Sequence, residues 1–212
     1  MEKIARMGVD FSEEERNLFS VAFKNQIGNR KESLKNISSK IEQDSKLNVV
    51  FLSKSKEYKK KIEDEYQTIC GNVLHLLNEY LIPNTTAPES IVFYYKMSGD
   101  YSRYGLDVDS SNEALKTQTR DYYAKATELA QKSLSPAHPI RLGLALNYAV
   151  FYYQILRDSQ TTYQMCKTAC DQAVPQLHTL DEMAYKDSLT ILSILHAEVT
   201  YHQYNGDPNN FL

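Results

Sequence analysis

Residues that can bind an anion lie close together in the stretch KMSGDYSRYGLDV, residues 96–108. If this stretch is helical, four of them fall at positions i, i+4, i+7 and i+8 and share one face: Lys96, Asp100, Arg103 and Tyr104. One interpretation is an anion site in which Arg103 and Tyr104 donate hydrogen bonds while Asp100 holds a cation in place. The alternative is a solvated face whose ion pairs each contribute about 0.2–0.5 kcal/mol. The stretch alone favours the solvated face.

Chemistry other than anion binding has little support in the sequence. It contains no Gly-rich phosphate loop, no nucleophile elbow and no His/Glu spacing that suits a metal. Cys166 and Cys170 are four residues apart and could supply half of a metal site, but no second pair completes it. We therefore expect these cysteines to pack as thiols, and we expect no enzyme, no metal site and no cofactor.

The composition argues against several classes of partner. The chain of 212 residues carries a net charge of −3, so nothing global favours nucleic acid or an acidic membrane surface. No apolar run approaches the roughly 18–20 residues that a membrane span needs, and the first residues lack an apolar signal core. The odd number of cysteines, three, suggests reduced thiols. We expect a cytoplasmic protein with no nucleic-acid or membrane partner.

Long amphipathic helices must position these residues, and no stretch is a convincing strand. Apolar residues recur with a period close to 3.6 along most of the chain. Capping boxes at Ser12, Ser110 and Thr179, each with Glu three residues on, mark three helix starts. Pro175 should kink or break the helix around it. Seven helices are predicted, over about residues 12–43, 51–81, 88–108, 110–134, 139–156, 161–180 and 179–204.

The predicted fold class is therefore all-α. The helix over residues 139–156 is apolar almost all round, so it should be the most buried. Successive antiparallel helix pairs then stack into a one-layer array with a concave groove.

Four longer blocks carry a family pattern. They are RNLFSVAFKNQIG (16–28), VFYYKMSGDYSRY (92–104), HPIRLGLALNYAVFYYQIL (138–156) and YKDSLTILSILHAEVTYHQ (185–203). In order and spacing they resemble the 14-3-3 family, and the resemblance covers about residues 11–204. It implies an all-helical cup that binds phosphoserine or phosphothreonine segments of other proteins. Members of this family are usually dimeric, act as signalling adaptors and are not enzymes.

The resemblance implies that the phosphate is bound by Lys24, Lys31, Arg103 and Tyr104. Lys24 and Lys31 are seven residues apart and hence on one helix face. A phosphate carries about −1.5 to −2 charges at neutral pH and three strong acceptor oxygens. Arg103 can donate to two of them, Lys24 acts as a point charge and Tyr104 donates one hydroxyl. With the resemblance, the anion-site interpretation becomes the favoured one.

Further positions match the ligand groove of the family. Lys96 and Asp100 match residues that support the phosphate pocket, and Asn147 matches an Asn that hydrogen-bonds the backbone of the extended ligand. Apolar residues on a helix are usually core, but the resemblance places five positions on the wall opposite the phosphate: Val21, Gly143, Leu146, Val150 and Ile194.

Several groove positions depart from the family pattern. Lys31 stands where the family has Arg and loses the bidentate fork. Glu198 replaces a ligand-gripping Asn and adds negative charge to a groove for an anionic ligand. Glu198 and His202 are i,i+4 and could pair, although a solvent-facing His is the commoner case. The other departures are Thr190 for a Leu, Gln154 for a Glu, and Tyr201 and His202 for a Leu-Trp pair.

These departures lead to a hypothesis about ligand choice. Phosphopeptide binding should survive because most of the phosphate-binding residues are kept, but it should be weaker or differently selective. The alternative is a protein that keeps the fold and binds an unphosphorylated acidic segment.

The chain is predicted to divide into three parts. Residues 1–10 are interpreted as a remnant of the N-terminal helical region, residues 11–204 as the 14-3-3-like domain and residues 205–212 as a polar tail. The family has two helices before the block that begins SEEERN, and they form much of its dimer interface. Only about ten residues precede that block here, so family-type dimerisation is expected to be poor.

Overall fold

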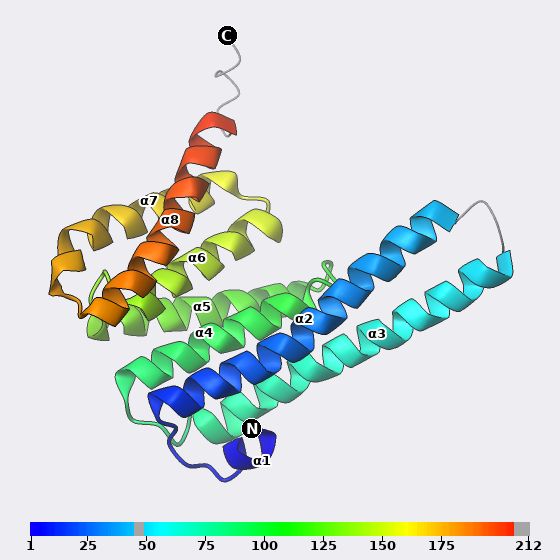
Figure 1. Ribbon diagram of the computed structural model, residues 1–212, viewed down its shortest axis with the longest axis horizontal. Helices are drawn as coiled ribbons and strands as arrows, with labels where there is room; N and C mark the ends of the chain where they lie inside the picture. The colour runs from blue at the N-terminus through cyan, green and yellow to red at the C-terminus, as the bar shows by residue number, and fades with distance from the viewer. Residues whose placement is uncertain (45–48, 206–212) are drawn as a thin grey trace. The chain divides into compact units, whose positions relative to one another are not determined.

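The computed structural model describes residues 1–44 and 49–205, and its regular elements are helices (Figure 1). No strand occurs in these ranges, so the prediction of an all-α fold is confirmed, and α2–α8 correspond to the seven predicted helices. No helix of the described ranges has the length and hydropathy that a membrane span requires. The helices are α1 (Glu2–Ala5), α2 (Glu13–Asp44), α3 (Val49–Leu76), α4 (Pro88–Gly105), α5 (Glu113–Ser133), α6 (Pro139–Gln154), α7 (Ser159–Ala173) and α8 (Glu182–Asn205), with a π-helical turn at Leu77–Leu81 and a 3₁₀ segment at Val174–Thr179.

One compact unit consists of Met1–Thr85 and Tyr104–Ser111. In it α2 and α3 pack side by side (Figure 1). The ring of Phe19 contacts the rings of Phe11 and Phe23 edge to face, with centroids 5.9 and 4.9 Å away, and all three side chains are buried. This apolar stripe orients the half of α2 that carries Lys24.

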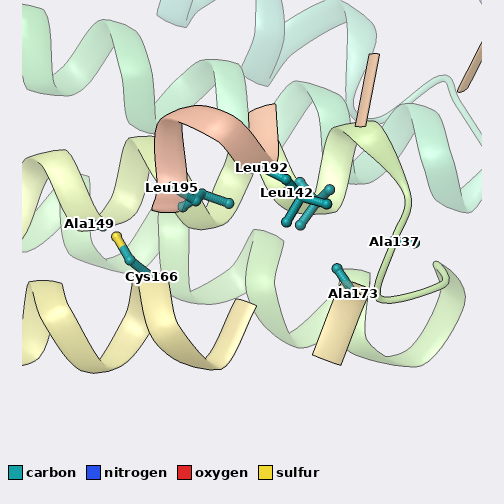
Figure 2. Close-up of a cluster of buried hydrophobic side chains, with 7 residues drawn as sticks. All are labelled: Ala137, Leu142, Ala149, Cys166, Ala173, Leu192 and Leu195. Atoms are coloured by element: carbon teal, nitrogen blue, oxygen red, sulfur yellow. The ribbon is translucent and has the colours of Figure 1, made fainter. Parts of the chain in front are cut away.

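The other compact unit consists of Thr86–Arg103 and the chain from Asn112 onward. Helix α6 contacts α5, α7 and α8, and its largely apolar sequence places Leu142, Ala149 and Phe151 in the interior. The prediction that this helix is the most buried one is wrong, because a larger share of α4 is buried, including the run from Met97 to Arg103. Apolar composition marks a core helix, but α4 also buries polar residues that hydrogen-bond to neighbouring helices. Figure 2 shows the core cluster that joins α6, α7 and α8, which comprises Ala137, Leu142, Ala149, Cys166, Ala173, Leu192 and Leu195.

One of the three predicted capping boxes is confirmed. The backbone N–H of Ser12 donates to Glu15 Oε2 at 2.9 Å, and the N–H of Glu15 donates to Ser12 Oγ at 3.2 Å. The boxes predicted at Ser110 and Thr179 are wrong. Helix α5 is capped by Asn112, whose side chain accepts from Leu115 at 3.0 Å.

Helix α8 is capped by Asp181, whose carboxylate accepts from the N–H of Ala184 at 2.9 Å. Asn and Asp cap at least as well as Ser and Thr, and here they lie nearer to the first helical residue. Thr179 instead closes the 3₁₀ segment by donating its hydroxyl to the carbonyl of Gln176 at 2.7 Å.

Proline and tight turns set the other helix ends. As predicted, Pro175 breaks the helix around it: α7 ends at Ala173, and the chain continues as the 3₁₀ segment. Helix α4 begins at Pro88 as expected but ends at Gly105, three residues before the predicted end, because the N–H groups of Asp107 and Val108 turn back to the carbonyls of Tyr104 and Gly105.

Candidate functional site

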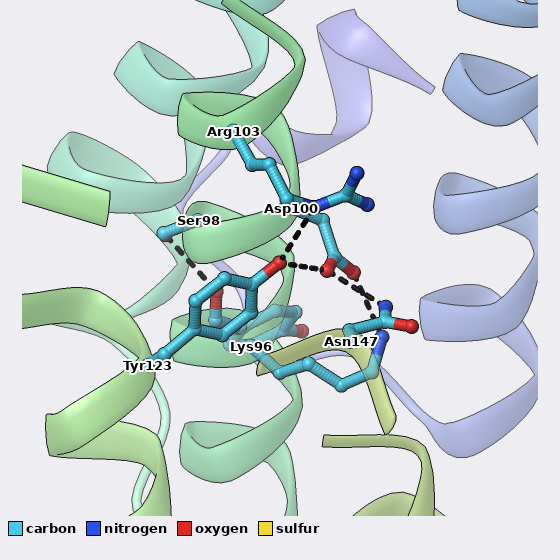
Figure 3. A network of polar contacts seen from close by, with 7 residues as sticks. Lys96, Ser98, Asp100, Arg103, Tyr123 and Asn147 are labelled. Carbon is cyan, nitrogen blue, oxygen red and sulfur yellow. Dashed lines mark hydrogen bonds and ion pairs between the residues drawn. The ribbon is translucent and has the colours of Figure 1, made fainter. Parts of the chain in front are cut away.

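The carboxylate of Asp100 is the centre of a polar network in the second unit (Figure 3). Its Oδ2 accepts from Lys96 Nζ at 2.8 Å, one turn away on α4. Its Oδ1 accepts from the Tyr123 hydroxyl at 2.6 Å and from Asn147 Nδ2 at 2.7 Å. Arg103 joins the network because its Nε donates to the Tyr123 hydroxyl at 3.3 Å. Three helices, α4, α5 and α6, therefore fix the side chains of this cluster.

The network is buried and still charged. Asp100 and Arg103 are each 7% exposed. Burial on its own raises the pKa of Asp100, but the charges of Lys96 and Arg103, with hydrogen bonds from Lys96 and Tyr123, hold that pKa below its ordinary value. The pKa of Tyr123 is raised well above its usual value, first by burial and then by the charge of Asp100. At neutral pH the cluster thus holds two cations and one carboxylate.

Tyr123 is a member of the site that sequence reasoning missed. Its ring lies against the backbone of α4 at Gly99, where a Cβ would come within 2.6 Å of the ring carbons Cδ1 and Cε1. The glycine before Asp100 therefore gives the ring its place. A glycine between Ser98 and Asp100 within a predicted helix was the available signal, but it does not identify the aromatic partner.

The side-chain amide of Asn147 contacts the Asp100 network through its nitrogen. Its nitrogen faces Asp100, whereas its oxygen points away in Figure 3. The side chain is partly buried on α6. This orientation leaves the amide oxygen and one N–H able to bond an extended backbone, which is the role that the resemblance implies.

Lys31 and Tyr104 lie close together in the first unit. Lys31 Nζ is 5.8 Å from the centroid of the Tyr104 ring, and the same ammonium donates to Asp107 Oδ2 at 2.8 Å. The Tyr66 hydroxyl donates to that oxygen at 2.9 Å. Asp107 is therefore a second residue that the sequence analysis missed, and it is a direct competitor of any anion for Lys31.

The other two predicted positions on α2 are exposed. Val21 is 52% exposed. Lys24 is also exposed, and it forms no ion pair with the residues that the structure describes. Both therefore have accessible side chains, as residues that contact a ligand need.

Positions predicted for the apolar wall differ in burial. A Cβ at Gly143 would lie 3.6 Å from Lys96 Cε and 3.9 Å from Ile191 Cδ1, so α4, α6 and α8 approach one another there. Leu146 packs against the core cluster, and Val150 is partly buried. On α8, Ile194 is 45% exposed, so the wall is part core and part surface.

The substituted positions on α6 and α8 are mostly at the surface. Gln154, the last residue of α6, is exposed, and so is Thr190, whose hydroxyl donates to the Lys186 carbonyl of its own helix at 3.0 Å. Tyr201 is 49% exposed, and its hydroxyl lies 3.3 Å from that of Tyr153.

Glu198 and His202 do lie one turn apart as a pair. Glu198 Oε2 is 3.5 Å from His202 Nε2. His202 is buried, contrary to the commoner solvent-facing case, because the rings of Tyr153 and Tyr201 pack around it with centroids 4.8 and 5.2 Å away. An acidic and aromatic cluster therefore stands where the family pattern has a Leu-Trp pair.

The cysteines behave as packing residues. Burial raises the pKa of Cys70 and of Cys166 to about 12, which keeps both as neutral thiols. No group of three or more His, Cys, Asp or Glu side chains suited to a metal occurs in residues 1–44 and 49–205.

The chain is similar to known proteins over nearly its whole length. The family model described as 14-3-3 protein matches residues 1–203. The chain is 48% identical to 14-3-3 protein beta/alpha of Homo sapiens over 202 residues, which is 94% of this chain and 82% of that protein. At the same coverage it is 46% identical to the Gallus gallus protein of that name and 45% identical to 14-3-3 protein beta/alpha-B of Xenopus laevis. The protein therefore belongs to the 14-3-3 family.

Proposed function

We propose that this protein is a phosphoserine- and phosphothreonine-dependent adaptor that binds segments of other proteins and catalyses no reaction. The observation that carries the proposal is the hydrogen-bonded network in which Asp100 and Tyr123 hold Lys96 and Arg103. Donors held in place by the protein bind an anion with little further loss of side-chain entropy. We place the action in the cytoplasm, in keeping with the three unpaired cysteines.

The charges of the network suit an anion. Lys96 and Arg103 carry two positive charges, and the ionised Asp100 offsets one of them. The terminal nitrogens of Arg103 can donate to two phosphate oxygens in parallel. Tyr104, the next residue of α4, supplies a hydroxyl donor.

We assign Lys24 and Lys31 to the same phosphate on the strength of the family resemblance. Lys24 offers an accessible ammonium without an ion-pair partner in the described residues. Lys31 is shared with Asp107, so a phosphate has to displace or share that contact. A lysine already engaged by a carboxylate supports weaker binding than an unengaged arginine fork.

Two carboxylates, those of Glu198 and Asp107, support an altered ligand preference. Glu198 brings a carboxylate to α8, and Asp107 neutralises part of the charge of Lys31. Both disfavour a ligand with acidic residues beside the phosphate. The second candidate function is the binding of an unphosphorylated acidic segment. The Lys31–Asp107 pair supports it, because a carboxylate of the ligand can replace the carboxylate of Asp107 at Lys31 more readily than this shared lysine can satisfy a phosphate dianion.

Fluorescence anisotropy tests the proposal. A labelled peptide with one phosphoserine flanked by arginines is titrated with the protein, beside its unphosphorylated twin and a twin with Glu at the phosphosite. We expect saturable binding of the phosphopeptide only. Equal binding of the Glu twin would favour the second function, and no binding of any peptide would overturn the proposal.

Two substitutions locate the interaction. Arg103→Glu reverses the charge held by Tyr123 and should abolish phosphopeptide binding. Lys125→Glu makes the same charge change at an exposed position of α5 and should leave binding within about twofold. Equal losses in both variants would mean that net charge, and not the Arg103 site, governs the affinity.

A further inference from the structure

A cavity of about 350 Å³ lies among α5, α6 and α7 in the second unit. Its volume falls in the range of roughly 300–1,000 Å³ that small-molecule sites occupy. None of the residues that carry the proposed phosphopeptide function lines it. The cavity is therefore separate from the proposed phosphopeptide site, and its ligand has to be inferred from its own lining.

Arg141 is the one charged residue among those that line the cavity. Its guanidinium is fixed at two points: Nη1 donates to the Leu134 carbonyl at 2.9 Å, and Nη2 donates to Gln172 Oε1 at 3.1 Å. These bonds use two of its five N–H groups. Neither partner is a carboxylate, so the positive charge is not neutralised by the groups that hold it.

The rest of the lining combines apolar side chains with amide and hydroxyl side chains. Leu142 and Leu144 of α6 and Ala130 of α5 are buried, and Figure 2 shows Leu142 within the core cluster. Met165 and Ala169 of α7 are partly buried. Pro136 and Ala145, which are partly buried, complete the lining together with exposed glutamines and exposed or partly buried threonines. A ligand of matching chemistry has one negative end and an apolar body.

We propose that this cavity binds a small monocarboxylate with an apolar tail, whose carboxylate pairs with Arg141 and whose tail lies on the apolar side chains of α5, α6 and α7. A guanidinium prefers a planar carboxylate because two N–H groups can donate in parallel. A single cation without an acidic neighbour in the lining selects a single negative charge. The proposal stands independently of phosphopeptide binding.

Isothermal titration with octanoate, and with octanol as its neutral twin, tests the proposal on the full chain. Octanoate should bind saturably, and octanol roughly tenfold more weakly, since it lacks the charge-assisted contact. Arg141→Gln should lower octanoate affinity by roughly tenfold and leave octanol unchanged. Arg120→Gln, which removes an exposed arginine of α5 outside the lining, is the matched control and should change neither.

A second variant covers the case in which Arg141→Gln fails to fold. Thr168→Trp, at an exposed lining position, fills the cavity while Arg141 itself is kept, and it should remove binding of both probes while phosphopeptide binding is kept. The proposal is overturned by absence of saturable octanoate binding at millimolar concentration, by equal affinity for the two probes, or by unchanged octanoate affinity in Thr168→Trp.

Discussion

The carboxylate of Asp100 accepts hydrogen bonds from side chains of three helices, Lys96 on α4, Tyr123 on α5 and Asn147 on α6. The i,i+4 pair of Lys96 and Asp100 could be predicted from the sequence because helix geometry fixes that spacing. The bonds from Tyr123 and Asn147 could not, since residues 23 and 47 positions away meet only after the helices pack. A pattern that looks like a solvated helix face is in fact a buried site.

The stability of the protein should depend on the charge of Asp100. Its folded-state pKa lies below the ordinary value of 3.8, so its contribution is complete above that value and is lost as the pH falls through the lower folded pKa. Asp100→Asn should therefore lower the free energy of unfolding at neutral pH. The gap between wild type and variant should narrow as the pH falls below about 4.

Urea unfolding of both proteins, from about pH 7 down to about pH 3, measures this dependence. Asp121→Asn, at an exposed position of α5, is the matched control and should follow the wild type. A gap of constant size across the whole range would show that Asp100 acts by shape and not by charge.

Asp107 should restrain phosphopeptide binding through Lys31. Asp107→Asn removes the charge that holds the Lys31 ammonium at 2.8 Å but keeps an oxygen that can accept from Tyr66. Exposed pairs of this kind are worth up to about 1 kcal/mol, so phosphopeptide affinity should rise by roughly two- to fivefold. Anisotropy titration provides the measurement, and unchanged or lower affinity in the variant would count against a role of Lys31 in binding.

At the scale of elements, the packing of α4 against α5 depends on a missing side chain. A Cβ at Gly99 would meet the Tyr123 ring at 2.6 Å. Gly99→Ala should therefore destabilise the protein by about 1–3 kcal/mol through overpacking. Gly71→Ala is the matched control: nothing lies within 4 Å of its added Cβ on α3, so it should stabilise by up to about 1 kcal/mol. Thermal unfolding of the two variants should thus give shifts of opposite sign.

The start of α5 shows which features of a helix could be predicted from the sequence and which could not. Both Ser110 and Asn112 are good capping residues, so local preference alone did not choose between them. The structure chooses Asn112, while Asp109 accepts from the N–H of Ser111 and thereby shapes the turn before the helix. Helix existence was predictable from the apolar period, but the exact first residue depended on competition among neighbouring polar side chains.

Asn112→Ala should lower the free energy of unfolding by about 1 kcal/mol because it removes the cap. Ser110→Ala should have an effect within about 0.5 kcal/mol, since no hydrogen bond of its side chain joins the helix start. Chemical denaturation distinguishes the two positions. A larger loss of unfolding free energy in Ser110→Ala than in Asn112→Ala would support the capping box that the sequence predicted at Ser110.

For the whole molecule, the question is whether net charge or local charge governs the approach of an anionic ligand. The protein carries a net charge of −3, so a phosphopeptide whose own net charge is negative is repelled at long range and attracted only near the basic residues. The Debye length is about 8 Å at physiological salt and about 30 Å at 0.01 M. Remote carboxylates therefore act on the ligand at low salt, and only those beside it act at physiological salt.

Glu198→Asn and Asp121→Asn each remove one negative charge, the first on α8 at the position that matches a ligand-gripping Asn, the second at the exposed position on α5. At low salt both should raise the affinity for a phosphopeptide of net negative charge. At about 0.15 M salt only Glu198→Asn should do so, by roughly two- to fivefold, and more for peptides with acidic flanks than for peptides with basic flanks. Anisotropy titrations at the two salt concentrations make the comparison. Equal gains for both variants at physiological salt would mean that Glu198 acts only through net charge and that ligand preference has another origin.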